Sequence, residues 1–367
     1  MPPPKDTVWK LEPHTLGKHL ILRAYLNAWF PILSKWNQRI LFIDAFAGPG
    51  EYEEGEDGSP VIALKALIEH QSRKKISAEV AFIFIEERKD RCDHLRELVR
   101  KYKPQLPVKS IIEVENSTFD EKMTEVLNQI EEQNKRLAPC FVMIDPFGIS
   151  GTPMSVIQRI LRNPKSEVYI SIMYNHINRF LDTSEFEQHL EELYGCTEWK
   201  RATQIIDTEE RELFLFELYK DQLRKAGAKY VLKFDIYEGN KHIYSIIFGT
   251  KNPLGCDRMK AAIWKIAPSG NFRYVGTKSK QMTFNLKTTN FEPLKRELQD
   301  EFIGKGWVSI EEVVNYVSSD KTDYHSGQVK KVLRQMEEDK EIEADPHSRK
   351  KKRTHPDGTK LSFLKKK

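Results

Sequence analysis

The chain has 367 residues, of which 39% are hydrophobic and 31% are charged, with a net charge of +5, and these values suit a water-soluble protein of about two domains. No apolar run reaches the roughly 20 residues that a membrane helix needs, and the start lacks an apolar secretion signal. The four cysteines are scattered without a C-x-x-C pair, so neither a metal site nor disulfides are expected, and the cytoplasm is the expected location.

The first expected element is an amphipathic helix that begins at about Thr15 and ends near Pro31. Apolar strands then alternate with helices. The strands are expected at residues 40–46, 80–86, 108–116, 139–148 and 166–174, and the helices at 60–70, 88–102, 119–135 and 152–162. Continuous apolar strands separated by helices indicate an α/β fold, in which helices cover both faces of a parallel, Rossmann-like sheet.

The pattern changes after the fifth strand. Residues 176–228 are expected to form a mostly helical insertion, and residues 230–250 an antiparallel hairpin around Gly239. These elements complete a first domain expected at 1–286. The second domain is expected at 287–367, because three helices, the second with Ser309 as its N-cap, precede two strands around a basic loop, as in a winged helix-turn-helix.

The stretch "DAFAGPGEYEEGED", residues 44–57, follows the first strand and has the glycine turn of a nucleotide site. A P-loop would need Lys and Ser or Thr where Glu51 and Tyr52 stand. A dinucleotide fingerprint would need glycine in place of Glu53, and the acidic loop would repel a pyrophosphate. S-adenosylmethionine carries cationic groups and no phosphate, so the carboxylates attract it. A tight turn before a solvated acidic loop is the alternative.

Polar side chains stand at the carboxyl ends of four successive strands, where a parallel sheet meets its ligand: Asp44, Glu86, Asn116 and Asp145. Asp44 and the turn from Gly48 to Gly50 are expected to hold the methionine part of the cofactor, Glu86 the ribose and Asn116 the adenine. A solvated strand end is the alternative for Glu86.

The motif "FAGPG", residues 46–50, resembles the F-x-G-x-G motif of class I methyltransferases. The motif "DPFG", residues 145–148, resembles their D-P-P-Y type motif, which occurs where exocyclic amines of nucleobases are methylated, and the D-P-F-G of dimethylguanosine tRNA methyltransferases. Together with "PHTLGKHLILRAYLNAWFPIL" and the terminal unit, these motifs resemble the three-Cys-motif partner proteins (TcmP) over most of the chain.

This resemblance implies a class I methyltransferase-like domain, S-adenosyl-L-methionine as its cofactor, a C-terminal winged helix, and a partner protein with a cysteine triad, of the iron–sulfur radical kind. It adds Phe46 to the cofactor site. It also implies that Asp145 and the carbonyl of Pro146 accept hydrogen bonds from the target amine, while Phe147 stacks on an extruded base. The glycine after Phe147 departs from D-P-P-Y, and a packed core ring is the alternative for Phe147.

Two functions therefore stay open. The first is a methyltransferase that acts on an amine of a nucleic-acid base, as partner of a three-cysteine protein. The second is a non-catalytic nucleic-acid-binding or regulatory protein whose methyltransferase-like domain senses the cofactor.

The basic charge lies at the C-terminus, where residues 345–367 carry nine basic and two acidic residues and so have a net charge of +7. The rest of the chain has a net charge of −2, which gives the total of +5. Residues 324–340 are expected to form the recognition helix, and the basic loop is expected to form the wing. The residues expected to contact nucleic acid are Lys330, Lys331, Arg349, Lys350, Lys351, Lys352 and Arg353. A solubilising tail and a protein-docking module are the alternatives.

Several other residues have a weaker expectation. His14 and Lys18 share one face of the first helix, for which a solvated surface is favoured. Asn175 and His176 are placed near the crevice, where they line a pocket or cap the next helix. Five tryptophans are expected in the core: Trp29, Trp36, Trp199, Trp264 and Trp307.

Overall fold

The computed structural model describes residues 4–268, 273–276 and 289–364. Within these ranges the chain divides into two compact units. The first holds residues 4–252 and 273–276, and the second holds residues 253–268 and 289–364. The boundary expected between residues 286 and 287 lies outside the described residues, so both domain ranges stay predictions.

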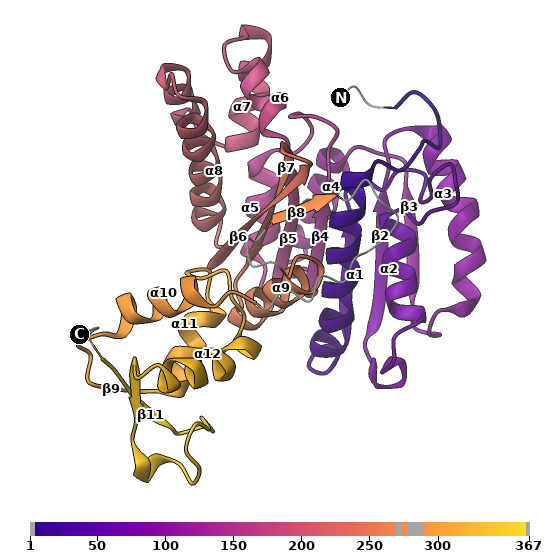
Figure 1. Cartoon of the computed structure of the whole chain (residues 1–367). Helices are drawn as coiled ribbons and strands as arrows, with labels where there is room; N and C mark the ends of the chain where they lie inside the picture. Colours follow the sequence, from indigo (N-terminus) through magenta and orange to yellow (C-terminus); the bar gives the residue numbers. More distant parts are fainter. Residues whose placement is uncertain (1–3, 269–272, 277–288, 365–367) are drawn as a thin grey trace. The chain divides into compact units, whose positions relative to one another are not determined.

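The first unit is built on a sheet with the strand order β3-β2-β1-β4-β5-β7-β6-β8 (Figure 1). The first five strands pair in parallel, whereas β7 runs antiparallel to both β5 and β6, so the expected parallel sheet with an antiparallel hairpin is confirmed. The short β8 was not expected. The strands are β1 (Arg39–Asp44), β2 (Glu79–Ile85), β3 (Ile111–Glu115), β4 (Cys140–Ile144), β5 (Ser166–Ile172), β6 (Tyr230–Glu238), β7 (Lys241–Thr250) and β8 (Arg273–Gly276).

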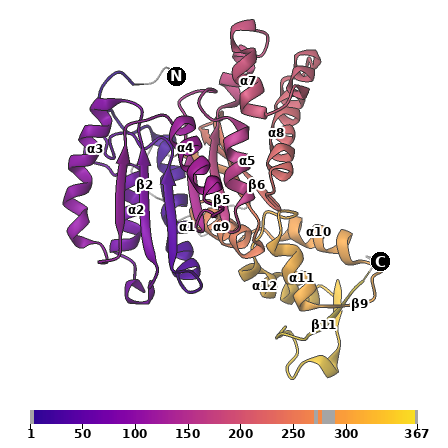
Figure 2. The ribbon, with the colours of Figure 1, turned by 180° about the vertical axis from the view of Figure 1, so that it is seen from behind.

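Helices cover both faces of this sheet, as Figures 1 and 2 show from opposite sides. Residues 174–225 form α6 to α8, which confirms the mostly helical insertion. The helices are α1 (Pro13–Ser34), α2 (Ser59–Ile68), α3 (Lys89–Tyr102), α4 (Phe119–Glu132), α5 (Met154–Arg162), α6 (Tyr174–Phe180), α7 (Glu187–Tyr194) and α8 (Thr208–Lys225).

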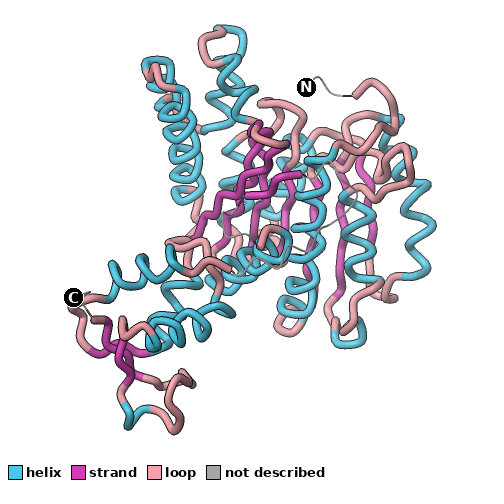
Figure 3. Tube along the Cα trace, viewed as in Figure 1, coloured by secondary structure: helices cyan, strands magenta, loops and turns pink. Residues whose placement is uncertain are grey.

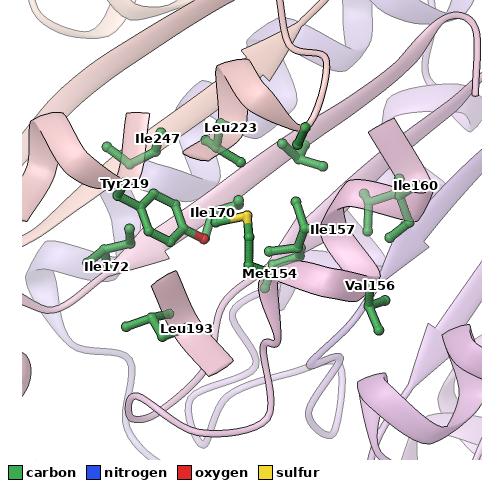
Figure 4. Close-up of a cluster of buried hydrophobic side chains, with 14 of the residues drawn as sticks. Met154, Val156, Ile157, Ile160, Ile170, Ile172, Leu193, Tyr219, Leu223 and Ile247 are labelled. Atoms are coloured by element: carbon green, nitrogen blue, oxygen red, sulfur yellow. The ribbon is translucent and has the colours of Figure 1, made fainter. Parts of the chain in front are cut away.

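Successive strand residues point to opposite faces, which gives the sheet two apolar layers. On the face of α1, Phe141 contacts Tyr25 and Trp29, with ring centroids 5.4 and 6.3 Å apart. On the other face, isoleucines of β5 and β7 pack against α5 and α8 (Figure 4). The sheet therefore packs against helices on both of its faces.

Helix α1 continues through Pro31 to Ser34, so the end expected near Pro31 is wrong. Proline lacks the N–H that would bond to the carbonyl of Asn27, four residues earlier. The Nε2 atom of His70 lies 2.8 Å from that carbonyl oxygen and donates to it instead. Because a side chain from another element satisfies the acceptor, the helix tolerates the proline.

Two of the five tryptophans expected in the core are not buried. Trp36 is 72% exposed and Trp307 is 54% exposed, so the expectation of burial is wrong for both. Trp36 stands just after the end of α1, and the Lys35 ammonium lies 4.7 Å from its ring centroid. Among the described helices, none is long and apolar enough to cross a membrane.

The second unit has the element order of a winged helix (Figure 3). Its three-stranded sheet has the order β10-β11-β9 and is antiparallel. Ser309 caps α11 as expected, because its side chain accepts a hydrogen bond from Glu312 N. The elements are α9 (Pro253–Ile266), α10 (Glu292–Phe302), β9 (Trp307–Ser309), α11 (Ile310–Ser318), α12 (Ser326–Glu338), β10 (Ile342–Ala344) and β11 (Lys360–Phe363).

Helix α9 was not expected, and it fastens the helix-turn-helix from one side. The Lys260 side chain is buried, and its Nζ donates to the carbonyls of Val317, Ser319 and Thr322 at the end of α11. The Asp257 carboxylate accepts from the backbone N and the hydroxyl of Ser326, at 2.6 and 2.8 Å, at the start of α12. One helix thus caps the end of α11 and the start of α12.

Candidate functional site

The turn after β1 requires its glycines. Gly48 and Gly50 have φ of 62° and 88°, in the left-handed region that side chains disfavour. A Cβ on Gly50 would lie 2.6 Å from the Cδ1 atom of Leu95. Because Gly58 N donates to the Gly50 carbonyl at 2.8 Å, the turn is closed against the start of α2.

Asp44 ends β1 with a carboxylate that the protein satisfies only in part. The residue has no exposed surface, and its Oδ1 accepts from Phe46 N at 3.3 Å. Its Oδ2 is buried without a hydrogen-bond partner among the described residues. Burial raises the pKa of Asp44 to about 7, although the Ser59 hydroxyl and the Phe46 N–H oppose the shift. A cationic group at this turn would complete the pairing.

Glu86 and Asn116 build the adjoining part of the edge. Both Glu86 oxygens accept backbone hydrogen bonds at 2.8 Å, one from Gly48 N and one from Arg88 N. Burial raises the pKa of Glu86, although these bonds oppose the shift. Each oxygen retains a lone pair for a hydroxyl ligand. Asn116 Nδ2 donates to the Glu86 and Glu87 carbonyls, at 3.0 and 2.8 Å, and so ties the ends of β2 and β3 together.

Asp145, at the end of β4, forms an ion pair with Lys18 of α1. The two side chains are 19% and 10% exposed, respectively. Burial raises the pKa of Asp145, but the Lys18 ammonium, together with Ser171 and His19, outweighs burial, so the pKa is lowered. His14, Lys18 and His19 are all buried, and the solvated face expected for this part of α1 is therefore wrong. His14 and Lys18 do lie on the same helix, as predicted. The sequence pattern does not reveal that Lys18 pairs with Asp145, which lies 127 residues further along the chain.

A cavity of about 230 Å³ opens beside Asp145. Its lining comes from the segment before α1, from α1, from the "DPFG" stretch, from the start of α6 and from β7. Asn175 and His176 both line it. The other lining residues are Pro4, Trp9, Glu12, His14, Thr15, Lys18, Asp145, Pro146, Phe147, Met173, Lys241, Ile243 and Tyr244.

Residues 4–12, called the N-terminal strap below, lie along this edge and were missed by the sequence analysis. The Arg91 Nη2 atom donates to the carbonyls of Pro4 and Asp6, at 2.6 and 3.0 Å, and Arg88 Nη1 donates to Pro4 at 3.0 Å. Glu53 N, from the acidic loop, donates to the Trp9 carbonyl at 3.0 Å. The strap is therefore fixed to both α3 and the loop.

The Trp9 ring joins the glycine turn to the "DPFG" stretch. Its centroid lies 5.8 Å from the ring centroid of Phe147 and 5.7 Å from that of Tyr52. A Cβ on Gly48 would lie 3.4 Å from the Trp9 ring, and the Arg91 guanidinium lies 4.5 Å from the ring centroid. Phe147 is 38% exposed, so it is not a buried core ring. Phe46, by contrast, packs toward Phe119, with centroids 6.2 Å apart.

In the second unit the basic residues divide into two groups. Lys330, Lys331 and the run from Lys350 to Arg353 are exposed. Arg349 differs, because its Nη1 and Nη2 donate to the Glu337 carboxylate at 2.7 and 2.5 Å and its side chain is 7% exposed. Arg349 thus fastens the basic loop to the end of α12.

Comparisons with known proteins bear on both units. A family model described as a GMT-like wHTH domain matches residues 272–349. Among solved structures, Trm1 from Pyrococcus horikoshii, with S-adenosyl-L-methionine, is similar at 14% identity with a TM-score of 0.36, and the match covers 72% of this chain and 62% of that one.

Two further structures are similar. An O-methyltransferase from Bacillus cereus in complex with SAH shares 12% identity over 66% of this chain and 83% of its own, with a TM-score of 0.34. TomG from Streptomyces achromogenes, in complex with SAM, shares 8% identity over 67% of this chain and 92% of its own, with a TM-score of 0.35. No curated protein matches the chain. These scores carry no argument about substrate, so function is inferred from the site itself.

Proposed function

We propose that the chain is an S-adenosylmethionine-dependent methyltransferase that acts on an amine of a nucleic-acid base. The observation that carries this proposal is the buried Asp44 carboxylate at the glycine turn. Its Oδ2 has no hydrogen-bond partner in the described part of the chain and is suited to a cationic ligand. The cavity beside Asp145 adjoins the same edge of the sheet, since Trp9 lines the cavity and lies against Gly48.

The residues at the strand ends fit the cofactor. Asp44 and the turn would hold the ammonium end, the remaining lone pairs of Glu86 would accept the ribose hydroxyls, and Asn116 and Phe46 would stand beside the adenine. When bound, S-adenosylmethionine supplies a methyl group from its sulfonium, whose sulfur keeps the electron pair of the broken C–S bond. The protein's own contribution is alignment and the exclusion of water.

On the substrate side, the Lys18 ammonium holds the Asp145 carboxylate in place. The other oxygen of Asp145 and the carbonyl of Pro146 would accept hydrogen bonds from the target amine and orient its nitrogen. The exposed ring of Phe147, braced by Trp9, would stack on the base.

The alternative is a regulatory protein that binds the cofactor and nucleic acid without transfer. The ion pair between Lys18 and Asp145 favours it, because it occupies one acceptor oxygen of the residue that would orient the amine. Transfer of radiolabelled methyl groups to total DNA and RNA separates the two functions. Intact cofactor binding without any transfer would favour the regulatory protein.

We propose two partners from the sequence. The exposed basic residues of α12 and the wing would contact nucleic-acid phosphates. The resemblance to three-Cys-motif partner proteins suggests a second protein with a cysteine triad, of the iron–sulfur kind. Co-purification, followed by sequencing of bound nucleic acid and mass spectrometry of bound protein, tests both.

Cofactor binding is expected to strengthen as the pH rises from 5.5 to 7.5. Asp44 has a pKa of about 7, so below that pH it must lose a proton before it can pair with a ligand ammonium. Affinity should therefore change about tenfold per pH unit well below pH 7. Calorimetry with S-adenosylmethionine over this range measures the effect, and it should vanish in Asp44→Asn.

Glu54→Gln is the matched control for Asp44→Asn, because it removes an exposed carboxylate from the acidic loop that follows the glycine turn. It should bind as the wild type does at every pH. Binding that is independent of pH in the wild type, or binding of NAD in preference to S-adenosylmethionine, would contradict the cofactor assignment.

Replacing Trp9 with alanine is expected to speed the release of S-adenosylmethionine. The ring fills the space between the glycine turn and Phe147, and the loss of one such aromatic contact corresponds to about a tenfold change in rate. Stopped-flow measurement of the dissociation rate gives the result. Trp36→Ala, which removes an exposed tryptophan outside the cavity, is the control. Equal release rates in both variants would show that the strap does not retain the cofactor.

A further inference from the structure

The cavity contains an imidazole that the site has not yet used. His14 lines the cavity and is 8% exposed, and its Nδ1 atom is buried without a hydrogen-bond partner among the described residues. The ring lies edge-on to Tyr244, with centroids 5.8 Å apart, and the Tyr244 hydroxyl donates to the His14 carbonyl at 3.0 Å. The ring position is therefore fixed, while Nδ1 has no partner among the described residues. A buried polar group without a partner is rare and calls for a ligand.

Asp145, the carboxylate in the cavity lining that pairs with Lys18, is a poor acceptor for a substrate proton. The Lys18 ammonium pairs with Asp145 and lowers the pKa of that carboxyl group, which makes it a weaker base. Lys18 is itself engaged in the pair. Among the described residues that line the cavity, His14 thus offers an open, neutral acceptor on the helix that also carries Lys18.

We propose that His14 is the proton acceptor for the methylated nitrogen. This inference rests on the proposed function and deepens it. As the lone pair of the substrate nitrogen forms the new N–C bond, its N–H bond breaks and leaves its electron pair on nitrogen. The proton passes to the imidazole nitrogen that carries a lone pair. The amine's second N–H stays hydrogen-bonded to the Asp145 carboxylate or the Pro146 carbonyl, which orients the nitrogen, and His14 later releases the proton to water.

The charges around His14 keep the imidazole ready to accept. Burial is the main cause that lowers its pKa, and Lys18 on the same helix adds to the shift, while Glu12, Glu238 of β6 and Asp145 oppose it. Tyr244 and Lys241 of β7 and His176 of α6 also line the cavity. The net shift is downward from 6.5, so the ring is unprotonated at pH 7, as a general base must be.

The assignment narrows the substrate class. A proton acceptor is needed only where the methylated atom carries a hydrogen that it must lose. Asp145, Pro146 and His14 all line the cavity. An amino group has two N–H bonds, so one can be held by the Asp145–Pro146 stretch while the other is given up to His14. Adenosine, cytidine and guanosine carry such a group, whereas uridine does not.

The first test needs no methyl transfer. Full-length protein with ¹³C-labelled histidine rings is titrated by NMR in the presence of S-adenosylhomocysteine, and the His14 signal is assigned by its loss in His14→Gln. Its pKa should lie below 6.5. Adding an amino nucleoside at millimolar concentration should shift this signal, whereas adding uridine should not. The signal of the partly exposed His189 on α7, outside the cavity, should stay unchanged in every case.

The second test uses the nucleic acid that the wild type methylates. The single-turnover rate of the wild type should rise with pH up to the pKa measured for His14 and then level off. In His14→Gln and His14→Asn it should fall about 100-fold and lose that rise, with little change in substrate KM. His189→Gln is the control, and cofactor affinity shows that the variants are folded.

The outcomes separate the two proposals. No transfer by the wild type defeats the proposed function, and the NMR titration then decides whether His14 contacts the substrate base. Transfer by His14→Gln at the wild-type rate and with the wild-type pH profile overturns the role of His14 alone. A His14 signal that responds to none of the nucleosides also overturns it.

Discussion

Replacing Lys350, Lys351, Lys352 and Arg353 with alanine is expected to flatten the salt dependence of nucleic-acid binding. All four residues are exposed in the wing. If each neutralises one phosphate of B-DNA, the slope of log affinity against log salt should fall by about 3.6. Wild-type affinity would then drop about 150-fold more than that of the variant between roughly 50 and 200 mM salt. Fluorescence anisotropy with one duplex at several salt concentrations measures both slopes.

A charge-matched variant controls for net charge. Lys101, Lys103, Lys109 and Arg136 are exposed in the first unit, and their replacement with alanine removes the same charge. Binding by this control should keep the wild-type slope, and cofactor affinity should be unchanged in both variants. Arg349 is left intact, because its loss would release the basic loop from Glu337. A wing variant with the wild-type slope on both DNA and RNA would refute phosphate contact by the wing.

Replacing Lys260 with methionine is expected to destabilise the second unit by about 3 kcal/mol or more. Methionine keeps most of the buried stem, but three carbonyls, those of Val317, Ser319 and Thr322, lose a charged donor. Each acceptor left unpaired in a buried position costs about 1–3 kcal/mol. Hydrogen exchange of the α11 and α12 amides in the full chain should accelerate about 100-fold.

Lys265→Met is the matched control, since this lysine is exposed on the same helix α9. Its exchange rates should equal those of the wild type. The strands of the first unit should also exchange at the wild-type rate in both variants. If α11 and α12 in Lys260→Met exchange as slowly as in the wild type, Lys260 does not hold the helix-turn-helix.

The sheet, the hairpin and the winged helix were predictable because their signals are local. A run of apolar residues such as Leu41 to Ile43 indicates a central strand from the local sequence alone. Ser309 likewise caps α11 through Glu312, which is only three residues away. The glycine turn and its carboxylates favoured S-adenosylmethionine, and the family resemblance added Phe46 and the roles proposed for the "DPFG" stretch, which periodicity alone does not contain.

The misses depend on partners that are distant in sequence. Proline at position 31 predicts the end of a helix. The helix continues because His70 donates to the Asn27 carbonyl, which the proline leaves without a donor. Lys18 was predicted to lie on a solvated face, because its ion-pair partner, Asp145, is distant in the sequence. Helix α9 was not expected, and its buried Lys260 donates to carbonyls that lie about 60 residues further along the chain. The strap has no periodic pattern, and the arginines of α3 decide its course.

The chain passes between its two units more than once, and this has a practical consequence. The chain leaves the first unit after Asn252, forms α9 in the second, returns for β8, and leaves again before α10. No single cut therefore separates them. A recombinant fragment that starts at residue 289 lacks Lys260 and Asp257, and one that ends at Asn252 lacks β8. A winged helix expressed with its own caps has to begin before Pro253, and it carries an edge strand of the other unit with it.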